Sequence, residues 1–118
     1  MESILTSIKK MLGIEENYTH FDADLVMHIN SVFFILTQMG VGPSSGFTIQ
    51  DKSGTWNAFL QGDPTKLALV KSYIFLKVRL LFDPPQSSFA VESINRQISE
   101  FEWRLNIACD PGGEEETE

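Results

Sequence analysis

The segment YIFLKVRLLFDPP, residues 73–85, carries a large amount of apolar surface that the rest of this chain has to cover. Its first ten residues have the length of a helical segment and carry aliphatic or aromatic side chains on almost every side. Asp83, Pro84 and Pro85 then end the helix, because a residue before proline avoids the helical region and proline cannot donate a backbone hydrogen bond. A helix that is apolar all round must be surrounded by other elements. The sequence therefore predicts a helical domain built around this segment.

Four helices are expected, and together they predict a mainly α-helical fold. Their ends follow from capping residues, glycines and prolines. The expected helices cover about residues 3–12, 23–39, 64–82 and 87–108. Gly13 suits a left-handed C-cap of the first helix, Asp22 an N-cap of the second, and Asp63 an N-cap of the third. The prediction is a small bundle of about four helices around the central apolar helix.

Residues 41–62, VGPSSGFTIQDKSGTWNAFLQG, form a long insertion between the second and third helices. Glycines and a proline break regular structure at its start, FTIQ (47–50) alternates as a short strand does, and DKSG after it is a turn. The segment 55–60 fits either a return strand or a helical turn. We therefore expect a hairpin-like loop. An insertion of this length in a compact domain is usually functional or mobile.

The formal net charge of −7 is placed unevenly along the chain. Residues 110–118 hold five acidic side chains and no base, whereas the remaining residues hold nine bases and eleven acids, a net charge of −2. We expect a disordered acidic tail at 110–118 and a single domain at 1–109. A body this close to neutral lacks the basic patch that tight nucleic-acid binding requires.

No segment indicates export, a disulfide or a membrane span. Cys109 is the one cysteine in the sequence, so it has no internal partner for a disulfide. The N-terminus lacks the apolar core of a signal peptide. The apolar run of the central helix is interrupted by Lys77 and Arg79, and it is shorter than the roughly 18 residues that a membrane helix needs.

Side chains for catalysis or metal binding do not form a recognisable motif. His28 lies four residues after Asp24, which we interpret as a surface pair because no nucleophile or metal ligand accompanies it. A metal site would require three or four His, Cys or carboxylate ligands at recurring spacings. No glycine-rich phosphate loop is present. The sequence therefore favours a non-enzymatic protein without a cofactor, a catalytic site or a metal site.

Seven large apolar side chains do not fit the core faces of the predicted helices. They are Met27, Phe34, Phe47, Ile49, Trp56, Trp103 and Ile107. Either the first helix and the 41–62 segment cover them within one chain, or several of them contact another subunit, as large exposed apolar patches usually do. Trp103 and Arg96 are the best single candidates, because Trp and Arg are enriched in interface hot spots. We also expect the central helix to need cover from other copies of the chain.

Three segments are distinctive in combination: SGTWNAFLQGD (53–63), VKSYIFLKVRLLFDPPQSS (70–88) and ISEFEWRLN (98–106). Together they resemble the small head–tail connector, or adaptor, proteins of long-tailed bacteriophages. The resemblance covers about residues 22–106. It implies a small, mainly α-helical structural protein of the phage neck, with no catalysis.

Such proteins assemble side by side as a ring beneath the portal of the DNA-filled capsid. The ring extends the DNA channel and presents a docking surface for the next neck or tail component. The resemblance thus implies three protein partners, namely other copies of the chain, the portal protein and that next component. DNA would pass through without sequence-specific binding, and no membrane is involved. The chain would be made in the host cytoplasm and end in the virion.

The recurring positions of the family fall here on Trp56, Asp83, Pro84, Pro85, Glu100, Glu102, Trp103 and Arg104. The resemblance implies that the first four shape the fold and that the Trp103 and Arg104 side chains contact a neighbouring subunit. We expect Glu102 to pair with Lys77 or Arg79. The 47–50 segment is a candidate for strand addition to another subunit or to the portal.

Two other functions remain open from the sequence. One is a monomeric α-helical interaction module that binds a partner helix through the surface around Met27 and Phe34. The other is a metal-dependent nucleic-acid hydrolase of a packaging apparatus, which would need a cluster of carboxylates.

Overall fold

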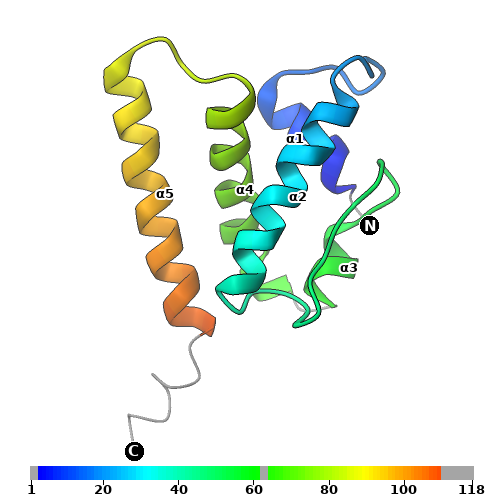
Figure 1. Ribbon diagram of the computed structural model, residues 1–118, viewed down its shortest axis with the longest axis vertical. Coiled ribbons are helices and arrows are strands. Elements are labelled where there is room, and N and C mark those ends of the chain that lie inside the picture. Colours follow the sequence, from blue (N-terminus) through cyan, green and yellow to red (C-terminus); the bar gives the residue numbers. More distant parts are fainter. Residues whose placement is uncertain (1–2, 62–63, 110–118) are drawn as a thin grey trace, which may run out of the picture.

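The computed structural model describes residues 3–61 and 64–109. These residues form α1 (Ile4–Leu12), α2 (Asp22–Gln38), α3 (Trp56–Leu60), the 3-10 helix η1 (Pro64–Lys66), α4 (Leu67–Phe82) and α5 (Ser88–Cys109). Figure 1 shows α5 at one edge with α4 beside it, α2 in front, and α1 and α3 towards the opposite edge. The predicted mainly α-helical bundle is confirmed.

The central helix of the bundle is α4, which packs against α1, α2 and α5. Val70, Tyr73, Ile74 and Val78 on this helix are fully buried. Within α4 only Ala68 and Leu81, close to its two ends, are exposed. Three helices of the same chain therefore cover the central helix, and the expectation that it needs cover from other copies is wrong.

Local signals define both ends of α1. The Ser3 hydroxyl accepts a hydrogen bond from the Thr6 backbone N–H at 3.2 Å. Gly13 has a φ of 82°, and the Ile14 N–H behind it donates to the Lys9 carbonyl at 2.8 Å. This is the left-handed C-cap that glycine favours, as the sequence predicts.

The end of α4 at Phe82 follows the predicted break at Asp83, Pro84 and Pro85. The Asp83 N–H donates to the Arg79 carbonyl at 2.9 Å, and Arg79 Nε donates to the Asp83 carbonyl at 3.0 Å. These two bonds satisfy backbone groups at the helix end, where the prolines have no N–H to offer. The chain then turns back into α5.

Two helices start differently from the prediction. Asp22 is the first residue of α2 rather than its N-cap, which is Phe21, and α2 has no side-chain cap at its start. The Asp22 carboxylate contacts Lys9 instead, so a longer-range ion pair replaces the expected local bond. The predicted cap Asp63 lies outside the described residues. The chain after it forms η1 before the regular helix starts at Leu67.

The described part of residues 41–62 is a loop that contains no strand, so the short strand expected at 47–50 does not form. The Asn30 side chain takes the place of a partner strand. Its Oδ1 accepts from the Ile49 N–H at 2.8 Å, and its Nδ2 donates to the Ile49 carbonyl at 2.9 Å. These two hydrogen bonds from one side-chain amide hold the insertion against α2. The alternative of a helical turn at 55–60 is confirmed by α3, which Thr55 caps through the Ala58 N–H.

Candidate protein–protein interface

The nine predicted interface residues fall into an interior group and an exposed group. Trp56 and Ile49 are only 1% and 3% exposed, and Phe47 is half-buried against the core. The exposed group consists of Met27, Phe34, Arg96, Trp103, Arg104 and Ile107. The structure therefore leaves six of the nine on the surface, all of them on α2 or α5.

Trp56 belongs to the core of this chain. Its indole Nε1 donates to the Ser7 hydroxyl at 3.0 Å, and that hydroxyl donates to the Ser3 carbonyl at 2.6 Å. The Lys71 ammonium lies 5.9 Å from the centre of its ring. Phe47 packs edge-on against Phe59, with ring centres 5.3 Å apart. The prediction that Trp56 and Ile49 are available to another subunit is therefore wrong, because long-range contacts inside the chain occupy them.

Met27 and Phe34 form an exposed apolar line, here called the α2 stripe. They are seven residues apart, which places them on one side of the helix. Phe34 is 65% exposed. The opposite side of α2 carries its buried residues, namely Leu25, Ile29, Val32, Phe33 and Leu36. A groove of about 400 Å³ runs beside Phe34, between α2 and residues 45–48. The α2 stripe thus borders a recess of its own chain.

A second exposed line, here called the α5 stripe, consists of Phe89, Arg96, Trp103 and Ile107. Their spacings of seven, seven and four residues keep them on one side of α5. Phe89 is 73% exposed and Trp103 is 63% exposed. Phe89 was not among the predicted interface residues, although its spacing to Arg96 is the same as that from Arg96 to Trp103. That spacing is the sequence signal that could have identified it.

The inner side of α5 holds the helix on α4. Ile98 and Leu105 are buried there. The Tyr73 hydroxyl donates to Glu102 Oε2 at 2.8 Å, so Glu102 contacts Tyr73 rather than the expected Lys77 or Arg79. Burial, together with this hydrogen bond, raises the pKa of Tyr73 above its ordinary value. The Glu102 position therefore belongs to the contact between α4 and α5 within one chain.

On the surface of α5, Arg104 pairs with Glu100 one turn earlier. Arg104 Nη2 lies 2.7 Å from Glu100 Oε2, and both side chains are more than half exposed. An exposed pair of this kind contributes only tenths of a kcal/mol to stability. Its charges remain accessible to a partner.

The lining of a groove between α2 and α5 shows which residues of the two helices lie at the same level along the bundle. It has a volume of about 420 Å³ and is lined by Ile35, Met39, Ser99, Glu102, Trp103 and Asn106. Trp103 therefore lies at the level of residues 35–39 of α2. Figure 1 shows that α2 and α5 run in the same direction, both starting at the same end of the bundle.

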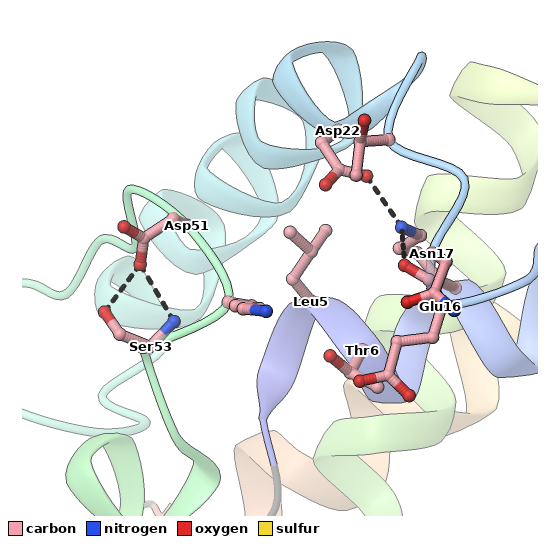
Figure 2. A pocket seen from close by; sticks show the side chains of 10 residues that line it. Leu5, Thr6, Glu16, Asn17, Asp22, Asp51 and Ser53 are labelled. Atoms are coloured by element: carbon pink, nitrogen blue, oxygen red, sulfur yellow. Dashed lines mark hydrogen bonds and ion pairs between the residues drawn. The ribbon is translucent and has the colours of Figure 1, made fainter.

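A recess lined mainly by polar residues lies between α1, the loop before α2 and the turn at 51–53 (Figure 2). Lys9 is almost fully buried beside it. Its ammonium donates to the carbonyls of Glu16 at 2.9 Å and Tyr18 at 2.7 Å, and it lies 2.9 Å from Asp22 Oδ1. That carboxylate oxygen accepts no regular hydrogen bond, so the ion pair is what compensates its burial.

The arrangement around Lys9 is structural rather than reactive. A lysine ammonium has three donors, and three acceptors surround this one. Across the recess, hydrogen bonds from the Ser53 hydroxyl and N–H hold the pKa of the Asp51 carboxyl below its ordinary value (Figure 2). Among the described residues, no three His, Cys, Asp or Glu side chains are grouped so that they could hold a metal ion.

Within residues 3–61 and 64–109, no helix is long and apolar enough to cross a lipid bilayer. A protein-family model described as "Phage connector protein" matches residues 4–112 of the chain. The match runs from the start of α1 to beyond the end of α5. No significant match was found among curated proteins or among solved structures.

Proposed function

Because this chain belongs to the phage connector protein family, we propose that it forms a ring in the phage neck and assembles on the portal. Connector proteins are structural and non-enzymatic components. In the proposed role the ring extends the DNA channel of the portal. It also presents a docking surface for the next neck or tail protein.

The observation that carries this proposal is the presence of two exposed apolar stripes on different helices. A ring subunit needs two different and complementary faces, because contacts of this heterologous kind close by rotation. The α2 stripe and the α5 stripe supply one face each. Both hold large apolar side chains in water, which in small proteins usually marks an interface.

The charge of the chain supports a conduit for DNA. Without its last nine residues the chain has a formal net charge of −2, and its bases are outnumbered by acids. Affinity for the DNA backbone comes mainly from clustered Lys and Arg. A channel wall without such a cluster lets DNA slide past, whereas a strongly basic wall would retain it.

Negative-stain electron microscopy and light scattering test the proposal on the full chain, alone at high concentration and mixed with portal. The expected result is annular particles with a mass that is a multiple of the 13.3 kDa chain. A strict monomer that also fails to bind portal would contradict it.

A second candidate function is a monomeric interaction module. The groove beside Phe34 favours it, because an apolar recess next to an exposed aromatic side chain can seat a partner helix. The two candidates differ at Trp103, which lies on another helix. Replacing Trp103 weakens a ring but leaves the binding of one partner helix at Phe34 unchanged.

A further inference from the structure

We propose that the α5 stripe of one copy packs onto the α2 stripe of the next copy, with the two helices parallel. This inference rests on the proposed ring and names the two faces that meet in it. The partner at each stripe is therefore a second copy of this chain.

The direction of the contact follows from the fold. Within one copy α2 and α5 run the same way (Figure 1). A rotation about an axis along the bundle leaves the direction of every helix unchanged. In a ring around such an axis, α5 of one copy therefore meets α2 of its neighbour in parallel.

The register of the contact follows from the groove between α2 and α5. That groove places Trp103 at the level of residues 35–39 of its own chain. A closed ring has no rise along its axis, so Trp103 lies at the same level of the neighbouring α2, just beyond Phe34. Arg96, seven residues earlier, then falls between Met27 and Phe34. Phe89 falls before Met27.

The two stripes interleave in this register. Each carries side chains every seven residues, and those of one stripe lie about halfway between those of the other. This is the arrangement in which side chains of two parallel helices fill the spaces of the facing helix. Large side chains that would collide at equal levels therefore pack side by side.

One basic side chain of the α5 stripe, Arg96, meets an acidic helix in the same arrangement. α2 has acidic residues in its first turn and contains no Lys or Arg. Arg96 on the α5 stripe is exposed and faces the neighbouring α2 in this register. Its aliphatic stem covers Met27, and its guanidinium can lie over the ring of Phe34 or extend toward Asp24.

Cysteine cross-linking tests the faces without altering either stripe. In a Cys109→Ser background, Ser31→Cys and Glu100→Cys are combined, since both positions are exposed and adjoin the stripes. A short bismaleimide is expected to give a ladder of covalent oligomers. The matched control combines Ser31→Cys with Gln97→Cys. Gln97 lies at the level of Ser31. Gln97 and Glu100 both line the groove between α5 and α4, but Gln97 lies about 60° further around the helix from the α5 stripe than Glu100 does.

The outcomes distinguish a wrong choice of contacting faces from the absence of a ring. A ladder with Glu100→Cys, at least fivefold stronger than with Gln97→Cys, supports the assignment. If scattering shows rings, and the ladder is absent or equal in both pairs, the assignment is overturned while the ring stands. If neither variant nor the wild-type chain assembles, even with portal, the proposed function and the inference both fail.

Discussion

The Lys9 ammonium shows how one buried charge can organise a loop. It joins α1 to two carbonyls of the following loop and to the first residue of α2. Lys9→Met keeps most of the apolar stem but removes the charge, leaving the Asp22 carboxylate and two carbonyls without their partner. We expect the free energy of unfolding to fall by about 3 kcal/mol. Urea denaturation measures this, with the exposed Lys10→Met as control. Equal stability of the two variants would show that the buried network contributes nothing.

The two tryptophans have opposite expected effects. Trp103 is 63% exposed, so Trp103→Ala is expected to leave the melting temperature of the monomer nearly unchanged. In assembly it removes a central side chain of the α5 stripe, and we expect a loss of about 2 kcal/mol per contact, or at least tenfold in the concentration needed for rings.

Trp56→Phe provides the matched control for Trp103→Ala. Because Trp56 is buried and donates to Ser7, this change should lower the melting temperature. Calorimetry and light scattering on both variants check the pair. Unchanged assembly in Trp103→Ala would remove the α5 stripe from the interface.

Helix α5 is held on one side by α4, and its α5 stripe is exposed, with Trp103 beside a groove shared with α2. The hydrogen bond from Tyr73 to Glu102 joins the two helices. The pKa of Tyr73 is raised in the folded chain, so its neutral form contributes stability below the ordinary pKa of tyrosine, about 10. This contribution is lost as the pH rises further, when a phenolate would face the Glu102 carboxylate.

The prediction is a steeper fall of the melting temperature above about pH 10 in the wild-type chain than in Tyr73→Phe. At neutral pH the same variant should lose only about 1 kcal/mol, because one hydrogen bond is removed. Thermal denaturation followed by circular dichroism between neutral and alkaline pH measures both effects. Parallel curves for the two proteins would mean that Tyr73 does not report on the contact between α4 and α5.

Sequence patterns predicted the elements whose signals are local. Gly13 and Asp83 mark helix ends through backbone geometry that a few neighbouring residues determine. Contacts between distant segments had no such signal. The amide of Asn30 replaces a strand partner of Ile49, nineteen residues away, so an alternating segment remains without a strand.

The same contrast between local signals and long-range contacts applies to the candidate interface residues. Helical spacing in the sequence places Met27 with Phe34, and Arg96 with Trp103, because every seventh residue returns to one side of a helix. The same spacing cannot tell whether another segment of the chain covers that side. For this reason the sequence predicts Trp56 and Ile49 as interface candidates, although the core encloses both.

In the molecule as a whole, the acidic residues at 110–118 carry most of the formal net charge. They supply five of the sixteen acidic side chains, and ring assembly would multiply this charge by the number of copies. Such a concentration of negative charge repels DNA over roughly a Debye length, about 8 Å at physiological salt. In the proposed ring, this charge would add to the lack of a basic cluster in keeping DNA from adhering.

Replacing Glu114, Glu115, Glu116 and Glu118 by Gln tests this role at constant chain length. The formal net charge of each copy changes from −7 to −3. We expect the wild-type ring to show no binding to duplex DNA at about 20 mM salt. The variant should bind DNA weakly at about 20 mM salt and release it at about 200 mM, where screening is stronger. Fluorescence anisotropy of a labelled duplex measures both. Tight binding of the wild-type ring at the higher salt would require a cluster of bases that the sequence does not contain, and would contradict a channel that lets DNA pass freely.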